Sequence, residues 1–132
     1  IVPLRRRGVS PGAVLAVAMG TGVAAMLAIL LGLAPSRFLW CLVGGAFACS
    51  NLAYSQLAGR FPQALAGRAN TALNLAAFAG AFAIQWGYGA ALDALAARGW
   101  SPVEAHRAAF GALVALQAAG YGWFLLGGRR AG

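Results

Sequence analysis

Residues 11–33 read PGAVLAVAMGTGVAAMLAILLGL, an apolar run without a charged residue. The uncharged interval around this run holds 29 residues, from Arg7 to Arg37, and exceeds the roughly 18 residues that mark a candidate transmembrane helix. Three similar intervals follow, with 22 residues between Arg37 and Arg60, 24 between Arg68 and Asp93, and 21 between Arg107 and Arg129. The pattern predicts a membrane protein with four transmembrane segments.

The composition of the whole chain agrees with this prediction. Hydrophobic residues make up 61% of the chain and charged residues 9%, whereas a soluble domain holds about 25% charged residues. Ten arginines stand against one aspartate and one glutamate, which gives a net charge of +8. A nucleic-acid-binding protein of this charge would need a polar surface, and the long uncharged intervals leave little room for one. We therefore expect a lipid bilayer, and no nucleic acid, as a partner.

Local signals set the ends of the predicted segments. Pro11 suits a first helical turn, and Pro35 ends the first helix. Ser101-Pro102-Val103-Glu104 combines a capping box with proline at the first helical position, and Gly127-Gly128 ends the last helix. We expect one membrane domain over residues 1–132, with spans at about 11–33, 38–57, 69–96 and 102–126. Because the connecting loops are short, the predicted fold is an all-α membrane protein of four antiparallel transmembrane helices.

The arginines are unequally shared between the two sides of this bundle. The side that holds both termini and the 59–67 loop carries seven arginines, and the other side carries three: Arg37, Arg98 and Arg107. Cytoplasmic loops are enriched in Lys and Arg, so we expect both termini and the 59–67 loop to be cytoplasmic. Stripes of small residues, such as Gly20-Ala24-Ala28, Gly45-Cys49 and Gly111-Ala115-Ala119, predict close helix packing.

Ionisable residues are absent from the middle of every predicted span. A proton relay on a mid-membrane carboxylate is therefore not expected, and the spacings show neither a catalytic triad nor a set of metal ligands. We expect no enzyme activity, no catalytic residue, no bound metal and no cofactor.

Neutral polar residues concentrate in the second and third spans. At 100° per residue, Asn74, Phe78 and Gln85 fall on one face of the third span, and Asn51 and Tyr54 share a face of the second. An unpaired amide in hydrocarbon costs several kcal/mol, so these faces must meet each other, other helices or water. Two interpretations follow: hydrogen bonds that hold the helices together, or the lining of a solvated substrate path. In the second interpretation the five residues are substrate-cavity candidates.

Several segments resemble the carboxy-terminal third of a major facilitator superfamily transporter. Leu4-Arg5-Arg6-Arg7-Gly8-Val9 looks like the end of the family's basic loop between helices eight and nine. The stretch from Gly59-Arg60-Phe61-Pro62 to Gly67-Arg68 resembles its basic loop between helices ten and eleven. Asn70-Thr71-Ala72-Leu73-Asn74-Leu75, leading to Gln85-Trp86-Gly87, resembles the eleventh helix. The four spans would then be helices nine to twelve.

This resemblance implies a secondary transporter that moves a small solute by alternating access across a bacterial inner membrane. In the family, helices ten and eleven help to line the central cavity, which corresponds to the polar second and third spans here. We expect the chain to be a segment that needs the remaining helices of the transporter as partners and that has no transport activity alone. The neutral lining is compatible with sugars, amphipathic drugs or metabolites.

Two alternatives remain open at the level of sequence. The chain is compatible with a complete small four-helix membrane protein that acts as an oligomeric transporter. Small multidrug-resistance exporters have this size, but residues 11–33 lack the carboxylate of their first helix. It is also compatible with a non-catalytic assembly or scaffold subunit whose polar faces simply pair.

Overall fold

The computed structural model describes residues 10–33 and 35–129, and within these ranges the chain is helical and contains no strand. The elements are α2 (Pro11–Leu31), α3 (Ser36–Ala48), the 3-10 turn η1 (Cys49–Asn51), α4 (Leu52–Ala58), α5 (Gln63–Ala96) and α6 (Pro102–Arg129). Four segments of the described chain are long and apolar enough to span a membrane: Pro11–Leu31, Ser36–Ala58, Gln63–Ala96 and Pro102–Gly127. The prediction of an all-helical chain with four candidate membrane spans is confirmed. The amino-terminal arginines and Arg130 lie outside the described residues.

The first helix begins where the sequence predicts and ends two residues early. The Ser10 hydroxyl oxygen accepts a hydrogen bond from the Ala13 backbone N–H (3.1 Å), and Pro11 occupies the first helical position. At the other end Gly32 adopts φ 66°, a left-handed conformation that terminates the helix after Leu31. The αL glycine, rather than Pro35, therefore stops the helix.

Both long carboxy-terminal helices extend beyond their predicted bounds. α5 begins at Gln63 instead of residue 69, because the carbonyl oxygen of Pro62 already accepts bonds from Leu65 and Ala66. Part of the predicted 59–67 loop is thus helical. α6 runs to Arg129, so Gly127-Gly128 does not end it as predicted.

The predicted capping box at the start of α6 is confirmed. The Ser101 backbone N–H donates to Glu104 Oε2 (3.0 Å), and the Glu104 backbone N–H donates to Ser101 Oγ (3.4 Å). Two backbone donors that the first turn of the helix would otherwise leave unpaired are satisfied in this way.

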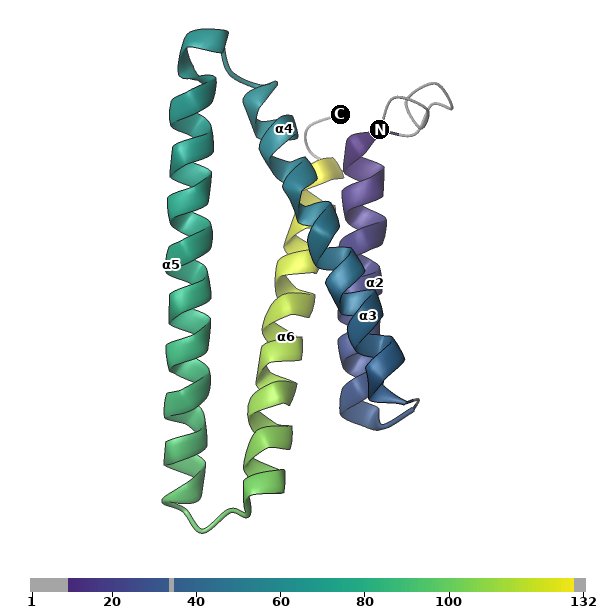
Figure 1. Cartoon of the computed structure of the whole chain (residues 1–132), viewed down its shortest axis with the longest axis vertical. Coiled ribbons are helices and arrows are strands. Elements are labelled where there is room, and N and C mark those ends of the chain that lie inside the picture. Colours follow the sequence, from purple (N-terminus) through teal and green to yellow (C-terminus); the bar gives the residue numbers. More distant parts are fainter. Residues whose placement is uncertain (1–9, 34, 130–132) are drawn as a thin grey trace.

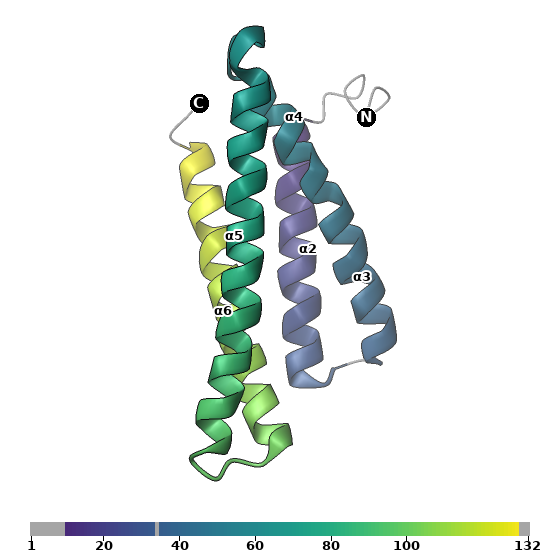
Figure 2. The same ribbon diagram turned by 60° about the vertical axis from the view of Figure 1, so that its left-hand side comes forward.

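The helices alternate in direction, and α2 lies between α3 and α6 (Figures 1 and 2). A small core forms where these three helices meet, from Ala25 and Met26 of α2, Val43 of α3 and Val114 of α6. α5 stands at the side of this group, packed against α6 and α4, and none of its residues is buried. The described part of the chain is therefore an open arrangement in which three helices share a core and the fourth presents a free face.

The second span is interrupted by η1, which the sequence analysis did not predict. A 3-10 turn advances about 120° per residue instead of 100°, so three residues rotate the following helix by about 60° relative to a continuous α-helix. Before the turn, α3 packs on α2; after it, α4 packs on α5 as well. The change of winding therefore allows the second span to pack against both α2 and α5.

Small residues permit close contacts at two seams of α2. A Cβ at Gly20 would lie 2.7 Å from the hydroxyl oxygen of Tyr121 on α6, and one at Gly22 would lie 3.2 Å from the Cβ of Ala46 on α3. The predicted stripe at Gly45 is different, because a Cβ there meets nothing within 4 Å. The stripe that begins at Gly20 in the first span thus takes part in close helix packing, whereas Gly45 in the second span does not.

Candidate functional site

One side-chain hydrogen bond links the two polar spans. The hydroxyl of Tyr54, on α4, donates to Oδ1 of Asn74, on α5, at 3.0 Å. The 3-10 turn just before α4 helps to turn Tyr54 toward α5. Two of the five predicted cavity residues are therefore in direct contact, on neighbouring helices and 20 positions apart in the sequence.

Asn51 does not join this pair. It is the last residue of η1, is exposed, and its Nδ2 donates to the carbonyl oxygen of Ala48 at 3.4 Å. Ser55 makes a similar local bond, from its hydroxyl to the carbonyl oxygen of Leu52 (2.9 Å). Such side-chain bonds to the preceding turn compete with helical bonding and bend helices. In the described structure the Asn51 side chain thus bonds within its own span, at the 3-10 turn that interrupts it.

Phe78 and Gln85 continue the face of α5 that begins at Asn74. They lie about 40° and 20° from Asn74 around the helix axis, and Gln85 lies about 16 Å further along it. Phe78 is 69% exposed, Gln85 is also exposed, and no described residue forms a hydrogen bond with the Gln85 amide. The face formed by Asn74, Phe78 and Gln85, called the open α5 face below, covers about half the thickness of a 30 Å hydrocarbon core.

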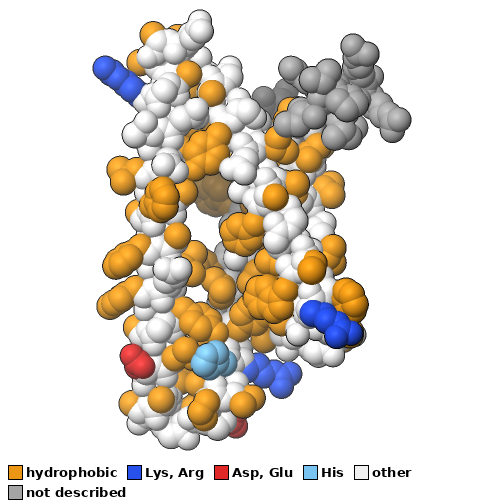
Figure 3. Space-filling view, viewed as in Figure 1, with side chains coloured by type: hydrophobic (Ala, Val, Ile, Leu, Met, Phe, Trp, Pro, Cys, Tyr) orange, Lys and Arg blue, Asp and Glu red, His pale blue; other side chains and the backbone are white. Residues whose placement is uncertain are grey.

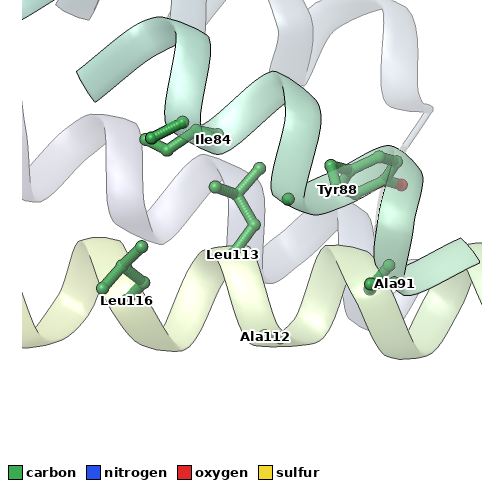
Figure 4. Close-up of a pocket in the computed structure, with 9 residues that line it drawn as sticks. Ile84, Tyr88, Ala91, Ala112, Leu113 and Leu116 are labelled. Carbon is green, nitrogen blue, oxygen red and sulfur yellow. The ribbon is translucent and has the colours of Figure 1, made fainter. Parts of the chain in front are cut away.

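The side of α5 that packs on α6 has a different character. Ile84, Tyr88 and Ala91 of α5 and Leu113 and Leu116 of α6 line a space of about 310 Å³ (Figure 4). The tyrosine hydroxyl is the one polar side-chain group among its nine lining residues. α5 thus turns an apolar face to α6, whereas its polar face meets Tyr54 of α4 at Asn74 and is exposed at Phe78 and Gln85.

Two polar side-chain atoms, one on α4 and one on α5, are buried. Gln56 Nε2 and Asn70 Oδ1 are inaccessible, and neither has a hydrogen-bond partner among the described residues. Asn70 lies one turn before Asn74 on α5, and Gln56 lies beside Gly12 at the start of α2. The polar side of α5 is therefore partly buried near its amino-terminal end.

Charged side chains lie near the ends of the helices and not in the middle of the face that Figure 3 shows. Arg60 and Arg68 belong to the end where α4 meets α5, whereas Arg37, Arg98 and Arg107 belong to the opposite end. The central part of the candidate site therefore contains only neutral groups among the described residues, which suits binding of an uncharged molecule by hydrogen bonds and aromatic contact.

Comparison with known proteins gives no further guide to this site. No family model matches the chain, and neither a curated protein nor a solved structure shows significant similarity to it.

Proposed function

We propose that this chain is part of a secondary transporter that moves a small, uncharged solute by alternating access. In this proposal it resembles helices nine to twelve of a major facilitator, lies in a bacterial inner membrane and has both termini in the cytoplasm. The open α5 face lines the solute path, and α4 contributes Tyr54 at its cytoplasmic end.

Support comes from one observation: Gln85 carries an exposed amide on a candidate membrane-spanning helix, and no described residue forms a hydrogen bond with that amide. An amide exposed to lipid tails is unfavourable by several kcal/mol. Water or further helices must therefore meet this face. Phe78 lies between Asn74 and Gln85, and this mixture of an aromatic ring with amides is typical of a site that orients a small molecule.

Cysteine accessibility tests the proposal. Cys41 and Cys49 are first replaced by alanine, and Asn74→Cys, Gln85→Cys or Leu75→Cys is then introduced into the protein in its native membrane. A thiol reacts as the thiolate, which forms in water and is suppressed in apolar surroundings. We expect a membrane-impermeant methanethiosulfonate to modify Asn74→Cys and Gln85→Cys at least about tenfold faster than Leu75→Cys.

Leu75 is a matched control, because it is 71% exposed in the structure and lies about 100° from Asn74 around the same helix. Equal protection of Asn74→Cys, Gln85→Cys and Leu75→Cys would contradict a solvated path. That result would favour a scaffold subunit in which other helices bury the polar residues.

An oligomer of this chain is the second candidate, since the absence of buried residues on α5 also suits a second copy. Oxidative cross-linking of the Gln85→Cys protein distinguishes the two. A disulfide-linked dimer within the membrane indicates that two copies meet at this face. A monomer whose cysteine still reacts with the impermeant reagent favours the transporter segment.

A further inference from the structure

A second space in the molecule lies away from the open α5 face, where α2, α3 and α6 come together. Its volume is about 360 Å³, at the lower end of the roughly 300–1,000 Å³ that small-molecule sites occupy. It adjoins the hydrophobic core, because Met26 and Val43 belong to both. The space shares no residue with the open α5 face.

The wall of this space is mostly apolar and contains small residues at the points where helices approach. Gly22 of α2, Ala46 of α3 and Gly120 of α6 leave room between the larger side chains of Met19 and Phe47. The remaining lining residues are Val23, Met26, Val43, Ser50, Gln117 and Tyr121. None of the eleven is charged, so the space has nothing to neutralise an ion.

Three polar side chains converge on this apolar space from two elements. Ser50 belongs to η1, and Gln117 and Tyr121 belong to successive turns of α6. No described residue forms a hydrogen bond with any of these three side chains. Gln117 is half-buried and lies about 22 Å from the Pro102 end of α6, a depth at which an unpaired amide is strongly disfavoured.

The space lies at a similar depth along each of the helices that line it. On α2 it spans the central residues Met19 to Met26, and on the second span it extends from Val43 to the 3-10 turn. It therefore lies near the middle of the candidate membrane spans rather than at an interface. Apolar walls with a few polar groups at this depth match a molecule that partitions into the bilayer.

We propose that this space binds a neutral, mostly apolar molecule whose single polar head, a hydroxyl or a carbonyl, hydrogen-bonds to Gln117. The amide of Gln117 both donates and accepts, so it satisfies either head group. Ser50 and Tyr121 contribute further hydroxyls beside the head, while the methionines and Phe47 surround the apolar body.

Photolabelling tests this site with an octanol that carries a diazirine on its chain. The chain is placed in phosphatidylcholine nanodiscs and illuminated, and the labelled residues are mapped by peptide mass spectrometry. We expect saturable labelling at Met19, Met26 or Phe47. Gly120 lines the space, and a Cβ at this position meets nothing within 4 Å, so Gly120→Leu places a bulky side chain at its wall and should reduce this labelling about tenfold or more.

Gly122→Leu is the matched control. Gly122 is on the same helix, a Cβ there also meets nothing within 4 Å, and it does not line the space, so its labelling should equal that of the unchanged chain. Gln117→Leu keeps the volume but removes the hydrogen bond, and should weaken binding about fivefold.

Competition then identifies the source of the natural ligand. If unlabelled octanol alone displaces the probe, the site takes a small amphipathic solute. If diacylglycerol also displaces it, the site takes a membrane lipid with an ester and hydroxyl head. Labelling that neither competitor reduces, or that is equal in the Gly120→Leu and Gly122→Leu proteins, would overturn the proposal, since it would mean that the probe only dissolves in the surrounding bilayer.

Discussion

The hydrogen bond from Tyr54 to Asn74 is a single interaction whose strength is expected to be modest. Polar contacts between transmembrane helices average about 0.6 kcal/mol and reach about 1.7 kcal/mol, because the separated helices also find polar partners. A double-mutant cycle with Tyr54→Phe and Asn74→Leu should therefore give a coupling free energy of about 0.6 kcal/mol. The measurement is the free energy of unfolding in SDS, followed by far-ultraviolet circular dichroism.

Ser55→Ala is the matched control for this cycle. Ser55 lies next to Tyr54, but its hydroxyl donates only to the carbonyl oxygen of Leu52 on its own helix. It should show no coupling with Asn74→Leu beyond about 0.3 kcal/mol. Additive effects of Tyr54→Phe and Asn74→Leu would mean that the two side chains do not interact in the folded protein.

Among the helices, the features that sequence predicts are those with a local cause. Charge-free length identified all four candidate spans, and the start of α6 followed from the Ser101–Glu104 capping box. The 3-10 turn has no such local signal. It lies where the second span, packed on α2 along α3, comes to pack on α5 along α4, and this depends on the neighbouring helices. The uncharged interval that follows Arg68 predicts a start near residue 69, whereas α5 begins at Gln63, because a helix can extend beyond the apolar part that crosses a membrane.

Contact between α2 and α6 depends on the absence of a side chain at Gly20. A Cβ there would lie 2.7 Å from the Tyr121 hydroxyl oxygen and 3.1 Å from the ring carbon that bears it. Gly20→Ala should therefore displace the end of the half-buried Tyr121 side chain and destabilise the protein by about 1 kcal/mol, the lower end of the cost of overpacking. Adding Tyr121→Phe removes the closest atom and should recover part of this loss. Thermal unfolding in detergent measures both effects.

Gly80→Ala provides the comparison on another helix. Gly80 lies inside α5, and a Cβ there meets nothing within 4 Å. The substitution should be neutral or stabilise the helix by up to about 1 kcal/mol, because alanine favours helix more than glycine does. If Gly20→Ala and Gly80→Ala behave alike, Gly20 is not a contact point between α2 and α6.

At the scale of the molecule, periodicity predicted part of the candidate site. It grouped Asn74, Phe78 and Gln85 on one face of the third span, and the structure brings Tyr54 to that face by a hydrogen bond. It did not predict the space beside Gln117, because that space arises from three helices whose distances depend on Gly22 and Ala46. A face belongs to one helix and is visible in its sequence, whereas a cavity belongs to several helices and appears only when they are assembled.

Orientation in the membrane is a property of the whole chain and follows from where the arginines gather. Arg60, Arg68 and Arg129 lie at one end of the described helices, and Arg37, Arg98 and Arg107 lie at the other. The described residues alone therefore give three arginines on each side and favour neither orientation. The prediction of cytoplasmic termini rests on Arg5, Arg6, Arg7 and Arg130, which raise the count of the first side to seven.

Reporter fusions decide between these two orientations. Alkaline phosphatase folds only outside the cytoplasm, so a fusion after Gly132 should be inactive and an insertion beside Ser101 should be active. Replacing Arg5, Arg6 and Arg7 by alanine lowers the first count from seven to four, against three on the other side. Activity of the Gly132 fusion should then rise, because this difference in positive charge orients the bundle. An active Gly132 fusion in the unchanged chain would reverse the topology and would place the Tyr54–Asn74 pair at the outer end of the solute path.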